Sequence, residues 1–189
     1  MIKLIILDRD GVINFDSPDY IKSPDEWQAV PGSLAAIAKI NHAGINVCVA
    51  TNQSGIARGY YSLSTLSDIH DKMCRELKAV GGHLDAIFFC PHGPDDHCNC
   101  RKPQPGLYQQ ALDYFKVEAA EALVIGDSAR DIEAAHTLGC QAMLVKSNKD
   151  VAEILTTPGF ENTPVYDDLT AAIEGGFVRF WAAKPGEAA

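Results

Sequence analysis

The sequence lacks a long apolar run and a surplus of basic residues. None of its apolar runs approaches the roughly 20 residues that a membrane-spanning helix needs. Its 16 lysines and arginines are outnumbered by 25 aspartates and glutamates, which gives a net charge of −9 and argues against general binding to nucleic acid. We therefore expect a protein with neither a membrane nor a nucleic acid as its partner.

The start of the chain lacks the features of a secretory signal. The apolar segment 1–7 is interrupted by Lys3 and runs into Asp8, so it is too short for a signal core of about 7–15 apolar residues. We therefore expect a cytoplasmic protein. The 189 residues, of which 47% are hydrophobic and 22% charged, suit one globular domain over 1–183 with a frayed tail at 184–189. We further expect a monomer.

Short apolar runs alternate with helical patterns along most of the chain. Ser33 is predicted to cap the first helix, further helices are predicted to begin at Ser64, Pro105 and Ala129, and 14–32 is predicted to be a loop. Strands are predicted at 2–7, 45–50, 85–89, 122–125 and 141–145. This alternation indicates an α/β fold with a Rossmann-like, doubly wound parallel sheet and helices on both faces.

Polar side chains follow the ends of these predicted strands. Ligands of open α/β sheets bind beyond the carboxyl ends of the strands, so these side chains should converge. Clustered carboxylates need a cation, oxygen ligands favour Mg²⁺, and Mg²⁺ with a lysine and a hydroxyl suits a phosphoryl group. The set comprises Asp8, Asp10, Thr51, Asn52, Arg101, Lys102, Asp127 and Asp131. Taken singly, Asp131 is better explained as an acid in the first turn of a helix, where it suits the helix dipole.

Four segments resemble, in order, the motifs of the haloacid dehalogenase superfamily of phosphotransferases. They are Asp8-Arg9-Asp10-Gly11-Val12, Thr51-Asn52, Lys102 and Gly126-Asp127-Ser128-Ala129-Arg130-Asp131. The resemblance covers nearly all of 1–146 and implies a haloacid dehalogenase-like fold, and the chain length leaves no room for a large cap domain. Segments 90–92 and 100–103 further resemble the subgroup of heptose-bisphosphate and histidinol-phosphate phosphatases.

The resemblance implies an Mg²⁺-dependent phosphatase that acts through an aspartyl-phosphate. The implied reaction removes the 7-phosphate of D-glycero-D-manno-heptose 1,7-bisphosphate, in the synthesis of ADP-heptose for the lipopolysaccharide core. The alternative is a phosphatase for histidinol phosphate or another small sugar phosphate, and loops 14–32 and 53–61 would decide between them. A non-catalytic zinc-binding scaffold is disfavoured because the catalytic set is complete.

The resemblance also assigns roles to residues. Asp8 would be the nucleophile and Asp10 the general acid and base. Mg²⁺ would be held by Asp8, Asp127 and the backbone carbonyl of Asp10. The remaining roles are phosphate binding by Thr51 and Lys102, substrate orientation by Asn52 and Arg101, and support of Lys102 or a metal-bound water by Asp131. Arg58 is either a second phosphate-binding cation or a solvated loop residue.

Three of the six cysteines crowd into eleven residues. Cys90, His92, Cys98 and Cys100 read C-x-H-x5-C-x-C, and three thiols with one imidazole are a common tetrahedral Zn²⁺ set. His97 is a competing ligand, but it adjoins Cys98, and adjacent ligands fold onto one ion with difficulty. We expect a structural Zn²⁺ in loop 90–100 that holds the segment carrying Arg101 and Lys102. The other cysteines are ordinary small hydrophobic residues at Cys48, Cys74 and Cys140.

Overall fold

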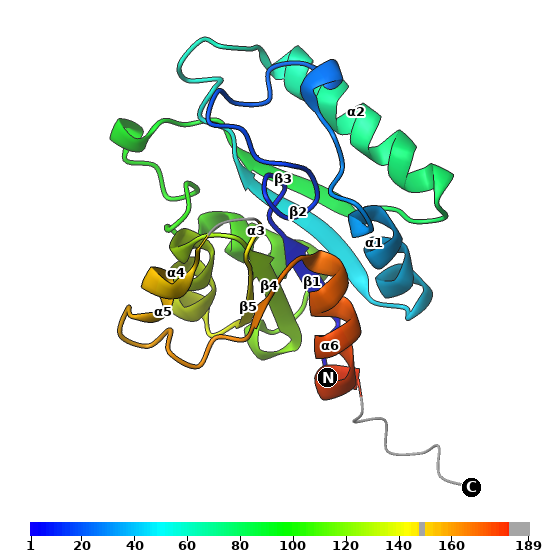
Figure 1. The fold of residues 1–189 in the computed structure, drawn as a ribbon. Helices are drawn as coiled ribbons and strands as arrows, with labels where there is room; N and C mark the ends of the chain where they lie inside the picture. The colour runs from blue at the N-terminus through cyan, green and yellow to red at the C-terminus, as the bar shows by residue number, and fades with distance from the viewer. Residues whose placement is uncertain (148–149, 182–189) are drawn as a thin grey trace, which may run out of the picture.

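A six-stranded sheet forms the centre of the computed structural model, which describes residues 1–147 and 150–181 (Figure 1). Its order is β3-β2-β1-β4-β5-β6, and every neighbouring pair is parallel. The strands are β1 (Leu4–Leu7), β2 (Asn46–Asn52), β3 (Ala86–Cys90), β4 (Ala122–Gly126), β5 (Gln141–Val145) and β6 (Val165–Tyr166). The predicted frayed tail 184–189 lies outside the described residues.

Helices cover both faces of this sheet. One face is covered by α1 (Ser33–His42), α2 (Leu63–Ala79) and α6 (Leu169–Trp181), and the other by α3 (Gly106–Phe115) and α4 (Ala129–Leu138) (Figure 1). The short α5 (Ala152–Leu155) lies beside α4. Single 3₁₀ turns occur at Pro24–Glu26, Pro94–Asp96 and Ala119–Glu121. The predicted doubly wound α/β fold is confirmed.

The position of β1 at the centre of the sheet explains why its sequence is apolar throughout. Ile5 and Leu7 pack into the core beneath α1, α2 and α6, whereas Leu4 and Ile6 pack into the core beneath α3 and α4. Successive side chains of a strand point to opposite faces, and here both faces are covered by helices. A strand in this position therefore buries every residue, and these four are at most 2% exposed.

The starts of three helices differ from the prediction. The third helix begins at Gly106, because Pro105 occupies the cap position. Ser33 does not cap α1, because Gly32 occupies the cap position and the Ser33 hydroxyl donates to the carbonyl of Ile13 at 2.7 Å. The second helix begins at Leu63 rather than Ser64, and the hydroxyl of Ser62 accepts a hydrogen bond from a backbone N–H of its first turn. Ser33 and Ser62 both stand close to the start of a helix. Whether such a serine caps its helix depends on tertiary contacts that the sequence does not display.

The elements after residue 150 were not predicted. Strand β6 has only two residues, which is too short for a recognisable pattern. Helix α6 contains Gly175 and Gly176, which lower helix propensity by about 1 kcal/mol each. Packing of α6 against α1 compensates for this, with Leu169, Ala172 and Ile173 in the shared core.

The register of the three central strands brings their carboxyl ends to one edge of the sheet. Leu7 pairs with Val49 in β2 and with Ile125 in β4. Polar residues that follow these positions therefore share the edge. Within the described ranges, the segments after β1 and β3 add only loops and 3₁₀ turns beside the crossover helices, and no cap domain is inserted there. No helix in the same ranges has the length and apolarity needed to cross a bilayer.

Candidate active site

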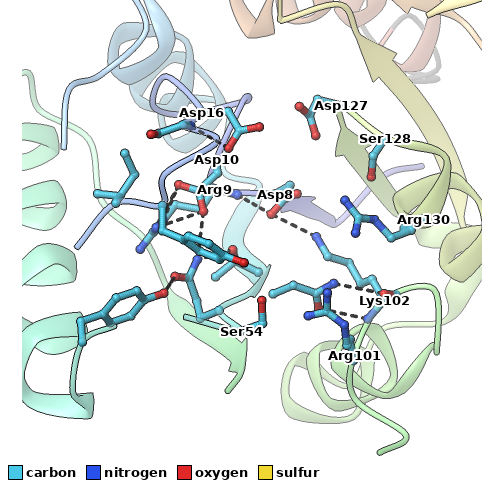
Figure 2. A pocket seen from close by; sticks show the side chains of 17 residues that line it. Asp8, Arg9, Asp10, Asp16, Ser54, Arg101, Lys102, Asp127, Ser128 and Arg130 are labelled. Atoms are coloured by element: carbon cyan, nitrogen blue, oxygen red, sulfur yellow. Dashed lines mark hydrogen bonds and ion pairs between the residues drawn. The ribbon is translucent and has the colours of Figure 1, made fainter. Parts of the chain in front are cut away.

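A pocket of about 260 Å³ lies at this edge (Figure 2). The ends of β1, β2 and β4 contribute to its lining, together with loop 14–32 and the segment that follows the cysteine cluster. Of the residues predicted to form the site, it brings together Asp8, Asp10, Thr51, Asn52, Arg101, Lys102 and Asp127. The polar side chains that follow the strands therefore converge, as their positions after the strand ends predicted.

Lys102 lies at the centre of the buried charges. Its Nζ is 3.0 Å from Oδ1 of Asp8 and 2.7 Å from Oδ1 of Asp131, and it donates to the carbonyl of Ala50 at 2.8 Å. The side chain is only 2% exposed. Burial alone would lower the pKa of Lys102, but the carboxylates of Asp131 and Asp8 raise it above its usual value. A fixed positive charge therefore stands beside Asp8.

Asp131 has partners on both oxygens. Oδ1 accepts from Lys102 and from the Tyr108 hydroxyl at 3.1 Å, and Oδ2 accepts from the Ser128 hydroxyl at 2.6 Å and its N–H at 3.1 Å. Burial favours the neutral acid, but Lys102 and these hydrogen bonds hold the pKa of Asp131 below its ordinary value. The geometry suits a residue that supports Lys102 better than one that binds a metal ion.

Asp10 is held by nitrogen donors on both oxygens. The Arg9 guanidinium donates to Oδ1 and Oδ2 at 2.9 and 3.0 Å (Figure 2). Asn14 donates to Oδ1 at 2.9 Å, and Gln53 donates to Oδ2 at 3.0 Å. Burial opposes ionisation, but the charge of Arg9 and these bonds keep the pKa of Asp10 below its ordinary range. Its carboxylate is therefore occupied, which leaves the backbone carbonyl as its candidate metal ligand.

The end of β2 supplies a hydroxyl and an amide. Thr51 is buried at the pocket wall and Asn52 is half-buried beside it. The Asn52 side chain exchanges two hydrogen bonds with the backbone of Lys102, at 3.1 and 3.0 Å. Asn52 therefore fixes the segment that carries Lys102, a task that the sequence did not indicate.

Asp127 follows β4 and faces the loop after β1. A side chain at Gly11 would collide with the Asp127 carboxylate, and Gly11 has φ = +82°, which favours glycine. Glycine at position 11 therefore lets the carboxylate approach the pocket. Oxygens of Asp8, Asp127 and Asp131 all lie within 4.8 Å of one another.

These acids make the pocket a site for a hard cation. Burial is the main reason that the pKa of Asp8 rises to about 7; Lys102 opposes the rise, and Asp131 and Asp127 add to it. A cation would relieve this repulsion, and an all-oxygen donor set fits Mg²⁺. The residues present therefore fit the predicted magnesium site.

Three arginines differ in their relation to the pocket. Arg101 and Arg130 line it and also line an adjoining cavity of about 600 Å³ (Figure 2). Arg58 is exposed and is not among the lining residues, which agrees with its alternative reading as a solvated loop residue. Sequence reasoning gave no role to Arg130, although it lies inside the segment 126–131 that carries the family motif.

The four predicted zinc ligands lie together in loop 90–100. The sulfur of Cys100 is 3.1 Å from that of Cys90 and 3.5 Å from that of Cys98, and Nδ1 of His92 is 3.3 Å from Cys100. Tetrahedral Zn²⁺ with Zn–S bonds of about 2.3 Å places its sulfurs about 3.8 Å apart. The observed separations are shorter than this, and all four ligand atoms lie within 4.8 Å of one another, which is within reach of one ion. His97 does not belong to this set of four.

The cysteine cluster is linked to the pocket by Arg101. Its guanidinium donates to the carbonyl of His92 at 3.3 Å, so the turn around the cluster sets its direction. Burial opposes thiolate formation at Cys98, but hydrogen bonds from the Arg101 backbone and from Cys100 lower its pKa to about 7. A thiol that ionises near neutrality suits a metal ligand.

Known proteins resemble this chain over nearly its whole length. Residues 99–172 match the family described as HAD-hydrolase-like. The D-glycero-beta-D-manno-heptose-1,7-bisphosphate 7-phosphatase of Bordetella bronchiseptica is 51% identical over 172 residues, covering 91% of this chain and 96% of that protein. The Pseudomonas aeruginosa enzyme of the same name is 50% identical over 168 residues, covering 89% and 94%.

A solved structure has the same fold. The D,D-heptose 1,7-bisphosphate phosphatase from B. bronchiseptica, complexed with magnesium and phosphate, superimposes with a TM-score of 0.88 at 50% identity. The match covers 94% of this chain and 99% of that one.

Proposed function

Because the chain belongs to the family of D-glycero-beta-D-manno-heptose-1,7-bisphosphate 7-phosphatases, within the HAD-like hydrolases, we propose that it removes the 7-phosphate of D-glycero-D-manno-heptose 1,7-bisphosphate. The chain is thus a phosphoric monoester hydrolase. The observation that carries the proposal is the identity of about half of all positions with these enzymes over nearly the full chain, together with the pocket in which Asp8, Lys102 and Asp127 meet.

Asp8 is the nucleophile of the proposed reaction. Its carboxylate attacks phosphorus, the sugar oxygen leaves, and an aspartyl-phosphate forms. Lys102, 3.0 Å from Asp8, stabilises the negative charge of the phosphoryl group, and Thr51 donates a hydrogen bond to one of its oxygens. Water then attacks phosphorus, the bond between Asp8 and phosphorus breaks, and inorganic phosphate leaves as the carboxylate is regenerated.

Asp10 transfers the protons. It protonates the leaving oxygen in the first step and deprotonates the attacking water in the second. The bonds from Arg9, Asn14 and Gln53 keep it ionised before substrate arrives. The negative charge of a bound phosphoester then raises its pKa, so Asp10 takes up a proton from solvent and can give that proton to the leaving oxygen. One group can therefore serve as acid and then as base.

Magnesium would be held by Asp8, Asp127 and the backbone carbonyl of Asp10. The support for this set is the cluster of buried carboxylates and the raised pKa of Asp8. When bound, Mg²⁺ supplies positive charge that stabilises the phosphoryl oxygens. The relative from B. bronchiseptica was solved with magnesium and phosphate.

The second phosphate of the substrate would bind Arg101 and Arg130. Both line the pocket and its neighbouring cavity, and an arginine fork matches phosphate oxygens. Zn²⁺ would be held by Cys90, His92, Cys98 and Cys100, where it fixes the loop that carries Arg101. Its role is structural, because four protein ligands leave no open position.

We place the activity in the cytoplasm, in a monomeric enzyme that supplies ADP-heptose for the lipopolysaccharide core. The test is a substrate panel with heptose 1,7-bisphosphate, histidinol phosphate and simple sugar phosphates, compared by kcat/KM. This ratio reports how well each transition state is bound. The proposal requires the heptose bisphosphate to give the highest value, and a higher value for histidinol phosphate would overturn it.

A further inference from the structure

The side chain of Gln53 is buried between two groups of the proposed mechanism. Its Nε2 donates to Oδ2 of Asp10 at 3.0 Å and to Oγ1 of Thr51 at 2.9 Å. An amide nitrogen has two hydrogens, so one side chain satisfies both acceptors. Gln53 is only 2% exposed, which leaves it little freedom to turn.

The bond to Thr51 also sets the direction of the threonine hydroxyl. Because Oγ1 accepts the hydrogen of Gln53, its own hydrogen must point elsewhere. Thr51 lines the pocket, so this hydrogen is suited to a phosphoryl oxygen bound there. Gln53 thereby orients the Thr51 hydroxyl, which is a donor, as well as the Asp10 carboxylate, which is an acceptor.

Tyr61 fixes which way the amide of Gln53 faces. The Tyr61 hydroxyl donates to Oε1 of Gln53 at 2.6 Å. Burial, with a contribution from Asp10, raises the pKa of Tyr61 to about 12, so it stays a donor. With Oε1 held in this way, the NH₂ group must face Asp10 and Thr51. A side chain at Gly55 would collide with the Tyr61 ring, so glycine there permits this approach.

The backbone of Gln53 is anchored as well. Its N–H donates to the carbonyl of Cys90 at 2.7 Å, at the end of the neighbouring strand β3. The side chain therefore projects from a fixed point of the sheet.

We propose that Gln53, oriented by Tyr61, is a positioning residue that fixes the proton-transferring Asp10 relative to the phosphate-binding Thr51. Arg9 also binds Asp10, but Gln53 joins it to the group that holds the phosphate. The inference rests on the roles proposed above for Asp10 and Thr51. The inference adds to these roles that the Gln53 amide sets the distance between Asp10 and the phosphate bound at Thr51.

The consequence is a dependence on the leaving group. An alkoxide needs a proton from a well-placed acid, whereas 4-nitrophenolate leaves readily without one. Loss of the Gln53 amide should therefore slow transfer from a sugar phosphate more than transfer from 4-nitrophenyl phosphate. A general loss of structure would slow both equally.

The experiment measures aspartyl-phosphate formation by rapid quench in the Mg²⁺-loaded full chain. The variant Gln53→Met keeps the length of the side chain and removes its hydrogen bonds, and Tyr61→Phe removes only the hydroxyl. Gln109→Ala, on the surface of α3, is the control. The substrates are 4-nitrophenyl phosphate and the sugar phosphate that the wild type hydrolyses fastest. The identity of the natural substrate is thus tested separately, by the substrate panel with the wild type.

The proposal expects Gln53→Met to slow transfer from the sugar phosphate by at least about tenfold more than transfer from 4-nitrophenyl phosphate. Tyr61→Phe should shift the same ratio in the same direction by a smaller factor, and Gln109→Ala should leave it unchanged. If Gln53→Met does not fold, the ratio for Tyr61→Phe decides. Equal losses for both substrates, or no loss, would overturn the proposal.

Discussion

The ammonium group of Lys102 lies 2.7 Å from Oδ1 of Asp131, and neither side chain is more than 2% exposed. A buried charge is tolerated only when it is paired, so each residue depends on the other. Asp131 thereby holds Lys102 beside Asp8, whose Oδ1 is 3.0 Å from the same nitrogen. Asp131, which does not line the pocket, thus acts on the pocket residue Asp8 through Lys102.

Removal of the Asp131 charge should affect both stability and catalysis. Asp131→Asn leaves Lys102 with one charged partner, which we expect to lower the free energy of unfolding by about 2 kcal/mol. We expect kcat to fall at least about tenfold because Lys102 is less firmly placed. Urea denaturation and steady-state kinetics measure the two effects.

A surface ion pair provides the control for this substitution. Lys146 and Asp167 are 2.7 Å apart, but their side chains are 50% and 78% exposed. Asp167→Asn should change stability by less than about 1 kcal/mol. Equal effects of the two substitutions would contradict the role assigned to Asp131.

The cysteine cluster should carry about one zinc per chain. Cys100→Ser removes a ligand, so we expect loss of zinc and a lower Tm, because the metal holds loop 90–100. Elemental analysis and calorimetry check this, with Cys74→Ser as control, since Cys74 is exposed on α2. A zinc-free protein with an unchanged Tm would refute the structural role.

The arginines of the pocket should distinguish bisphosphates from monophosphates. We expect Arg101→Ala and Arg130→Ala to raise KM for heptose 1,7-bisphosphate about tenfold or more and to affect a monophosphate less. Arg58→Ala should behave like Arg75→Ala on the exposed side of α2, with little change in either KM. A large rise in KM for the bisphosphate in Arg58→Ala would instead show that Arg58 binds the substrate.

His70 should make stability depend on pH. Burial and the charge of Arg9, whose Nη1 is 3.4 Å from Nε2 of His70, lower its pKa to about 4 from 6.5. The unfolded chain binds this proton more readily, so stability is unaffected above pH 6.5 and falls as the pH drops from 6.5 towards 4. The loss reaches about 3 kcal/mol when complete.

The comparison that isolates this contribution is wild type against His70→Gln. Carboxylates contribute to both proteins, so the difference between their stability profiles belongs to His70. The wild type should lose more stability between pH 6.5 and 4 in chemical denaturation. Parallel profiles would show that His70 is protonated as easily in the folded state as in the unfolded one.

The sequence predicted the parts of the site that follow strands. Asp8, Thr51 and Asp127 come directly after, or at the end of, apolar runs, and parallel strands bring such positions together. Contacts between side chains on different loops leave no such pattern. Arg9 lies between two acids and its role was not predicted from the sequence, yet it is 1% exposed and donates to Asp10. Tyr61 acts through Gln53, a contact that exists only after folding.

The most direct test of the account is ³¹P NMR of heptose 1,7-bisphosphate incubated with Mg²⁺ and enzyme. We expect the wild type to release inorganic phosphate from position 7 and to leave the 1-phosphate signal intact. Asp8→Asn, which retains the shape of the side chain but cannot attack phosphorus, should release none. Loss of the 1-phosphate, or full activity in Asp8→Asn, would contradict the account.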